Sequence, residues 1–63
     1  MTMATFYVIF DPIGRAFVRK GSGYTFTHSL NFAKHFTSEW SANNFRANMQ
    51  DADGLILKKI VRQ

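Results

Sequence analysis

The sequence contains no cysteine, which excludes disulfide bonds and thiolate metal sites as means of stabilising the fold. Acidic residues are also scarce, because four Asp and Glu stand against eight Lys and Arg and leave a formal net charge of +4. A positive charge suits a protein that binds nucleic acid, nucleotides or acidic protein surfaces. The charges are scattered, however, so a basic surface that is only solvated explains them equally well.

Long apolar segments are absent too. The longest apolar run covers residues 6–10, whereas a membrane-spanning helix needs about 20 apolar residues. The first residues, from Met1 to Ala4, lack the basic and apolar segments of a signal peptide. Together with the lack of cysteine, these features predict a cytoplasmic protein that does not act in a membrane.

Aromatic residues are abundant. Seven Phe, two Tyr and one Trp occur in a chain of 63 residues, which we interpret as one small domain covering residues 1–63. So short a chain buries only about 60% of its unfolded surface, and each aromatic ring adds roughly 150–250 Å² of burial. Oligomerisation is a usual remedy for a core of this size. We therefore expect a homo-oligomer.

Residues 5–20 have the pattern of a β-hairpin. β-branched and aromatic residues flank Asp11-Pro12-Ile13-Gly14, in which Asp, Pro and Gly occupy the positions that a type I turn favours. We expect a three-residue loop that ends in a left-handed Gly14. This loop predicts that Phe10 pairs with Ala16 and Ile9 with Phe17.

The predicted register sorts the hairpin side chains into two faces. One is a core face of Phe6, Val8, Phe10, Ala16 and Val18. The other mixes rings and arginines where a solvated face should be polar, and consists of Tyr7, Ile9, Asp11, Arg15, Phe17 and Arg19. Either the chain or a second copy covers this face, or it is a stacking platform for an anionic ligand. In the second case the predicted ligand-binding residues are Tyr7, Arg15, Phe17, Arg19 and Lys20.

The middle of the chain predicts a loop and a helix. Residues 20–23 favour a plain loop over a phosphate nest, and residues 24–27 an extended segment. Thr27 or Ser29 is expected to cap one or two helical turns, and Ser38 to cap the main helix, which runs to about Gln50. Its buried stripe is predicted to be Ala42, Phe45 and Met49, with Asn43, Asn44, Arg46 and Asn48 in water. Trp40 either closes the core or stands out as an interface anchor.

The last strand is predicted to cover residues 55–62, after a turn that ends in a left-handed Gly54. Neither of its faces is purely polar, which favours an interface there. The predicted interface residues are Ile9, Trp40, Ile56, Lys58 and Ile60. The order of elements is β-β-(short segment)-α-β, which predicts a two-layer α+β domain with an antiparallel sheet. The one main helix is expected to cover one face and to leave the other for a partner.

Catalytic groups are not apparent. No serine sits in a nucleophile-elbow pattern, and the four carboxylates are dispersed over turns and a helix start. His28 and His35 are seven residues apart, with no carboxylate spaced to complete a metal site. We therefore predict a binding protein that is not an enzyme and has no metal or cofactor.

Three kinds of function remain open. The first is binding of an anionic nucleotide or nucleic acid by stacking and by guanidinium–phosphate contacts. The second is inhibition of another protein through the sheet face or an open strand edge. The third is a structural homodimer whose functional surface lies elsewhere, for example on the Asn-rich side of the helix.

The layout of FYVIF, RAFVRKGSGYTF, SLNFAKHFTSEWSANNF and a final LILKKIV resembles small phage- and prophage-encoded proteins of unknown function. The resemblance covers most of the chain through structural motifs and assigns no binding residue. Such proteins include inhibitors of bacterial immunity, among them anti-CRISPR proteins and sponges that sequester nucleotide signals. The resemblance implies a counter-defence role in the host cytoplasm, directed at a nucleotide signal or a host defence protein.

Overall fold

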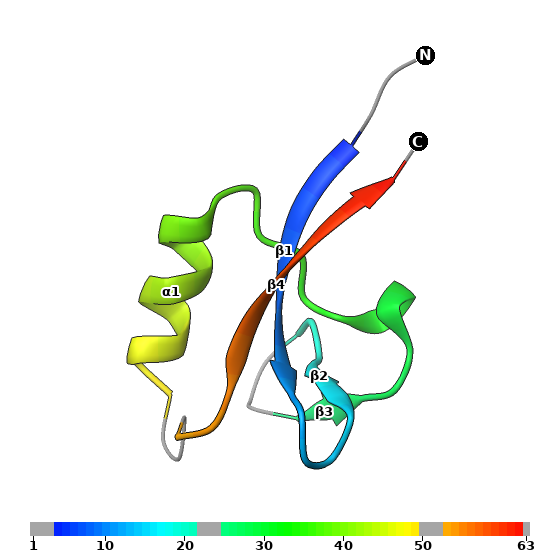
Figure 1. The fold of residues 1–63 in the computed structure, drawn as a ribbon, viewed down its shortest axis with the longest axis vertical. Helices are drawn as coiled ribbons and strands as arrows, with labels where there is room; N and C mark the ends of the chain where they lie inside the picture. The colour runs from blue at the N-terminus through cyan, green and yellow to red at the C-terminus, as the bar shows by residue number, and fades with distance from the viewer. Residues whose placement is uncertain (1–3, 22–24, 50–52, 63) are drawn as a thin grey trace.

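A four-stranded antiparallel sheet in the order β3-β2-β1-β4 organises the chain (Figure 1). It is seen in a computed structural model that describes residues 4–21, 25–49 and 53–62. The elements are β1 (Ala4–Asp11), β2 (Ala16–Val18), β3 (Phe26–Thr27), the 3-10 helix η1 (Leu30–Phe32), α1 (Glu39–Ala47) and β4 (Ile56–Arg62). The predicted small α+β domain, with one helix packed against an antiparallel sheet, is confirmed. Within the described ranges, no helix is long and apolar enough to cross a membrane.

The β1–β2 hairpin forms as predicted, but its register is shifted by one residue. Phe10 pairs with Phe17 and Asp11 with Ala16, so the prediction of Phe10–Ala16 and Ile9–Phe17 pairs is wrong. The expected turn chemistry is present, because Oδ1 of Asp11 accepts a hydrogen bond from the N–H of Ile13 at 3.0 Å.

The shift arises in the hairpin loop. The left-handed residue is Arg15, with φ of 54°, and not the predicted Gly14, so the loop is one residue longer. Gly14 has a different role: a Cβ added there would lie 2.9 Å from Oδ2 of Asp11. Gly14 thus leaves room for the Asp11 carboxylate, and its backbone is not left-handed.

The shifted register moves β2 side chains to the opposite sheet face. Ile9 now shares a face with Val18, and both are fully buried. They belong to the main core, whose buried members are Ile9, Val18, Phe36, Ala42, Met49 and Leu55. Phe10 and Phe17 lie on the other face.

The strands β1 and β2 separate beyond these pairs, and residues 33–36 fill the gap. Tyr7 exchanges both backbone hydrogen bonds with Phe36, at 2.8 and 2.9 Å. On the other side, the N–H of Lys34 donates to the carbonyl oxygen of Val18 at 2.8 Å. The extended segment places Phe36 in the core and leaves Phe32, at the end of η1, half exposed.

The main helix begins where predicted. Oγ of Ser38 accepts a hydrogen bond from the N–H of Ser41 at 3.1 Å, which confirms Ser38 as the N-cap. The predicted stripe is confirmed by the burial of Ala42 and Met49, between which Phe45 is partly buried. The helix ends at Ala47, so the predicted helix was too long, because Asn48 and Met49 lie beyond its end; Gln50 itself lies outside the described residues.

One predicted position on this helix is wrong, and one open alternative is decided. Arg46 is half-buried and donates to the carbonyl oxygen of Leu55 at 3.3 Å, so the prediction that it is fully solvated is wrong. Trp40 is 75% exposed, which excludes the alternative that it closes the core. The left-handed Gly54 is confirmed by its φ of 85°.

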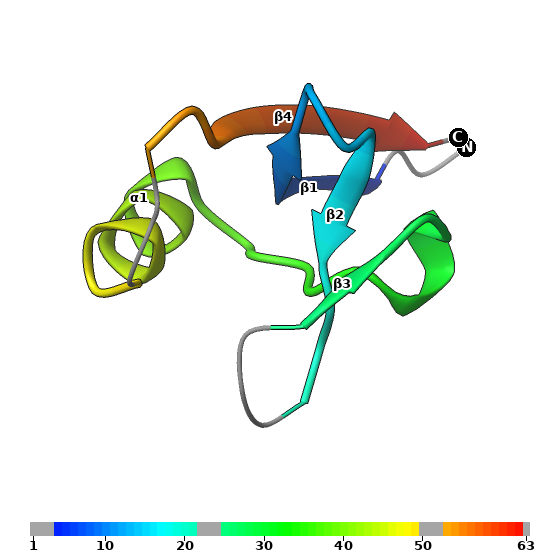
Figure 2. The ribbon, with the colours of Figure 1, turned by 90° about the horizontal axis from the view of Figure 1, so that it is seen from below.

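Each face of the sheet is partly covered by another segment of the chain, as the two views show (Figures 1 and 2). The helix α1 packs on one face, and η1 lies on the other side of the sheet. On that second face Val8 is fully buried and Phe6 stacks on His35, with ring centroids 4.0 Å apart. The expectation of a free second face is therefore correct only for part of its area, beside the hairpin.

Candidate functional site: a basic and aromatic sheet face

The face of the sheet opposite α1 collects cations and rings from three strands. The pairing registers place alternate residues of β1, β2 and β4 on it. We call this surface the basic face; its members are Phe6, Phe10, Phe17, Arg19, Ile56, Lys58, Ile60 and Arg62. It is a direct product of the one-residue register shift, because the predicted register put Phe10 and Phe17 on different faces.

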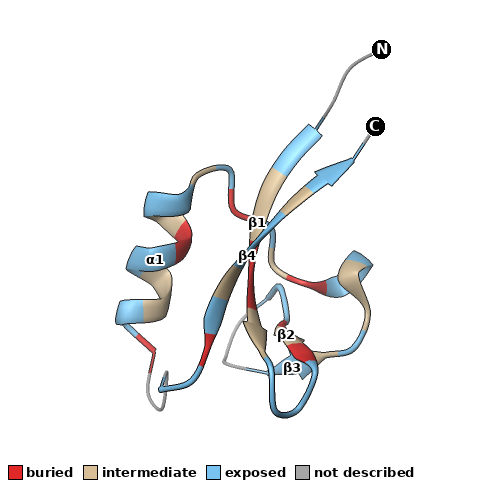
Figure 3. Cartoon of the chain, in the orientation of Figure 1, coloured by how far each residue is buried: buried red, intermediate tan, exposed pale blue. Residues whose placement is uncertain are grey.

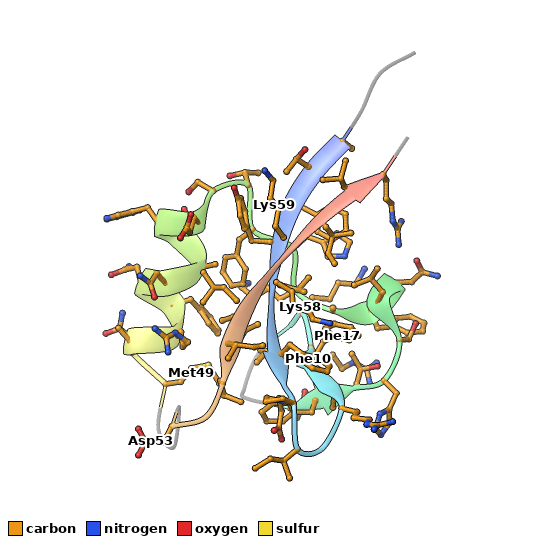
Figure 4. The ribbon with its side chains drawn as sticks, in the orientation of Figure 1. Phe10, Phe17, Met49, Asp53, Lys58 and Lys59 are labelled. Atoms are coloured by element: carbon orange, nitrogen blue, oxygen red, sulfur yellow. The ribbon has the colours of Figure 1, made fainter. Side chains whose placement is uncertain are left out.

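The centre of the basic face is a cluster of Phe10, Phe17 and Lys58 (Figure 4). The rings of Phe10 and Phe17 have centroids 5.2 Å apart and are tilted by 48°. Nζ of Lys58 lies 4.4 Å from the centroid of the Phe10 ring. Both rings are half-buried, while Lys58 and Ile56 beside them are exposed, so this cluster is open to solvent (Figure 3).

Two further cations on the basic face also lie over rings. Cζ of Arg62 is 5.5 Å from the Phe6 ring centroid, and its guanidinium donates to Oδ1 of Asn31 at 3.4 Å. Cζ of Arg19 is 5.6 Å from the ring centroid of Phe32. These contacts hold the long side chains along the surface without neutralising their charge.

The acidic residues of the described chain lie away from the basic face. Asp11 is engaged in the hairpin turn, Glu39 begins α1, and Asp53 lies in the turn before β4. The basic face therefore combines exposed positive charge with aromatic surface. This combination can hold a phosphate and a nucleobase together.

The predicted ligand-binding residues do not form one site. Phe17 and Arg19 lie on the basic face, whereas Tyr7 lies on the helix side and lines a hollow of about 230 Å³ with Glu39, Leu57 and Lys59. Arg15 is an exposed loop residue, and Lys20 follows the end of β2. The grouping was wrong for Tyr7 because the hairpin register is shifted.

The predicted interface residues are also divided. Ile56, Lys58 and Ile60 lie together on the basic face, beside Phe10. Ile9 is fully buried in the core, so its expected place on an exposed surface is wrong. Trp40 projects from the outer side of α1 and lines a hollow of about 260 Å³ with Asn43, Asn44 and Ala47.

Sequence reasoning missed Phe6, Phe10 and Arg62 as members of the site. Phe6 and Phe10 were assigned to the core because the expected three-residue loop placed them with Val18. A hairpin with a four-residue loop, had it been considered, would have predicted their place on this face, since it pairs Phe10 with Phe17.

Both histidines have structural contacts. Nδ1 of His28 donates to the carbonyl oxygen of Arg15 at 3.1 Å, and Nε2 of His35 donates to that of Leu30 at 3.0 Å. Across the described ranges, no three His, Asp or Glu side chains gather as a metal site would require.

Comparisons with protein-family models, with curated proteins and with solved structures gave no match for this chain.

Proposed function

We propose that this protein binds a nucleotide or single-stranded nucleic acid on the basic face and sequesters it without catalysing a reaction. The observation that carries the proposal is the cluster in which Lys58 lies 4.4 Å from the ring of Phe10, with the Phe17 ring beside it. The cluster brings an exposed cation and two half-buried rings together at one place on the surface.

The physical basis is the complementarity of this cluster to a nucleotide. A base that stacks on an aromatic side chain gains about 1–3 kcal/mol. The phosphate attracts Lys58, and Arg19 on the same face supplies a planar guanidinium for another phosphate of the ligand. Binding on this face requires no acid, base or nucleophile from the protein, in keeping with the predicted lack of enzymatic activity.

The structure offers a matched pair of variants for a test. Lys58 and Lys59 are adjacent and both exposed, but they lie on opposite faces of β4 (Figure 4). Replacement of either by Ala changes the net charge equally. We expect Lys58→Ala to weaken binding of a fluorescein-labelled oligo-dT by about fivefold or more, because a cation at a phosphate is lost.

The measurement is fluorescence anisotropy at several salt concentrations, followed by competition with a panel of mono-, di- and cyclic nucleotides. Binding should weaken steeply with salt, and Lys58→Ala should reduce the slope of log K against log salt by about 1. Lys59→Ala should change the affinity by less than about twofold, as a general charge effect. Equal losses from both variants, or no binding to any member of the panel, would refute the proposal.

A second candidate, inhibition of a host defence protein, is supported by Trp40. This side chain is 75% exposed on the outer side of α1, and tryptophan is enriched among interface hot spots. Trp40 and the basic face lie on different parts of the molecule, so Trp40→Ala separates the two functions. A partner protein captured by the native chain and lost with Trp40→Ala, while the oligonucleotide still binds, would favour inhibition.

We also propose a counter-defence role, exerted by sequestering a nucleotide signal, and a homo-oligomer. Native mass spectrometry, before and after incubation with the nucleotide panel, tests the oligomer and the sequestration. An oligomer that carries a discrete anionic mass supports sequestration between subunits. A monomer that binds the ligand would retain the site but refute the oligomer.

A further inference from the structure

The strand β4 forms one edge of the sheet and is paired along its whole length with β1 alone (Figure 2). The direction of its backbone groups follows from Tyr7, which exchanges both hydrogen bonds with Phe36 and pairs laterally with Lys59. In an antiparallel pair, a residue bonded to one neighbour points away from the other. Lys59 therefore directs its N–H and C=O outward, away from β1, and by alternation so do Leu57 and Val61.

Within the described part of the chain, these outward groups have no backbone partner. They form a row of three donors and three acceptors at the spacing of a strand. An open row of this kind is a template for the addition of another extended segment.

The charge of β4 determines which kind of strand can pair with its open edge. Lys58, Lys59 and Arg62 are its charged residues, and it contains no carboxylate. In the symmetric pairing of two copies that uses all three outward residues, Lys59 lies opposite Lys59 of the second copy. Directly opposed like charges destabilise a strand pair, so this edge disfavours a second copy and favours an acidic strand.

The two sides of an added strand meet different surfaces. On the basic face its side chains lie beside Lys58 and Arg62. On the helix side they lie beside the hollow of about 230 Å³ that Tyr7, Glu39, Leu57 and Lys59 form at the edge. A strand with alternating acidic and apolar residues satisfies both sides, with carboxylates toward the cations and an apolar side chain toward Tyr7 and Leu57.

We propose that the open edge of β4 binds an extended acidic segment of another protein by strand addition. This inference concerns a protein partner and does not depend on nucleotide binding at the basic face. It predicts that three backbone amides, those of Leu57, Lys59 and Val61, become hydrogen-bonded only when the partner strand is present.

The test is solvent-exchange NMR of the whole protein with the blocked peptide Glu-Val-Glu-Val-Glu-Val-Glu as the probe. At a peptide concentration about nine times Kd, exchange at these three amides should slow about tenfold, because one molecule in ten remains free. The same peptide with Lys in place of Glu, and an acidic peptide N-methylated at alternate residues, should slow it less than about twofold.

Two variants at one position complete the test. Val61→Pro removes an outward N–H at a side chain that is 47% exposed, and edge positions tolerate proline. Val61→Thr keeps the N–H and the branched shape. We expect Val61→Pro to lose the protection at Leu57 and Lys59, and Val61→Thr to keep it.

If Val61→Pro does not fold, the N-methylated peptide makes the same distinction with the unaltered protein. Unchanged exchange in the presence of the acidic peptide would overturn the proposal. So would protection that rises with protein concentration alone, since that result assigns the edge to a second copy.

Discussion

Replacement of Arg15 by Gly tests the hairpin loop that creates the basic face. Arg15 has a left-handed backbone with φ of 54°, which costs a residue with a Cβ about 1–2 kcal/mol. Gly avoids this cost but increases the entropy of the unfolded chain, which removes about 0.4–1 kcal/mol of stability. The net expectation is that Arg15→Gly stabilises the protein by roughly 0.5–1 kcal/mol.

The neighbouring glycine provides the matched variant with the opposite sign. A Cβ at Gly14 would lie 2.9 Å from Oδ2 of Asp11, whose Oδ1 accepts from the N–H of Ile13. Displacing this carboxylate weakens a hydrogen bond worth about 0.5–1.5 kcal/mol. Gly14→Ala should therefore destabilise the protein, even though Ala lowers the entropy of the unfolded chain.

Urea denaturation followed by circular dichroism measures both changes, and an unchanged m-value shows that the unfolded state is comparable. For a domain of this size, 1 kcal/mol corresponds to a shift of about 4–8 °C in Tm. Destabilisation by Arg15→Gly would refute the reasoning. It would indicate that Arg15 is an ordinary strand residue and that the three-residue loop ending in Gly14 is the correct one.

Three further predictions concern the core, the helix cap and the exposed tryptophan. Ile9→Ala should lower the free energy of unfolding by about 2–5 kcal/mol, because Ile9 is fully buried. Circular dichroism should then show a largely unfolded protein even without urea. A small loss of stability, like that from a surface residue, would contradict the assignment of Ile9 to the core. Ser38→Ala should lower the free energy of unfolding by about 1 kcal/mol, because the hydrogen bond from the N–H of Ser41 is lost, and Ser38→Asp should restore this stability. Urea denaturation measures both variants. An unchanged midpoint for Ser38→Ala would show that the cap is not formed. Trp40→Ala should change the free energy of unfolding by less than about 0.5 kcal/mol, because the side chain is 75% exposed; a large loss would place Trp40 in the core.

The local parts of the fold were predictable because their causes lie within a few residues of each other. The hydroxyl of Ser38 meets the N–H of Ser41 three positions later, and the Asp11 carboxylate meets the N–H of Ile13 two positions later. The spacing of Ala42, Phe45 and Met49 similarly specifies one side of a helix.

The composition of the site was less predictable than the elements that carry it. Lys58, Ile56 and Ile60 were correctly grouped because they alternate along a single strand. Phe17 was grouped with Tyr7 because the loop length was wrong by one residue, and a one-residue slip moves every side chain of a strand to the other face. Phe10, at the centre of the basic face, was assigned to the core for the same reason.

The sequence by itself determined the main strands and helix, the Ser38 cap, the Asp11 turn contact, the basic charge and the alternation of rings and cations, since these depend on neighbouring residues. Only the tertiary structure decided which rings and cations share a face. That outcome depends on whether Gly14 or Arg15 takes the left-handed position, a difference on the order of 1 kcal/mol. It depends equally on residues 33–36, which enter between β1 and β2 through hydrogen bonds to Tyr7 and Val18. Contacts so far apart in the chain leave no periodic trace in the sequence.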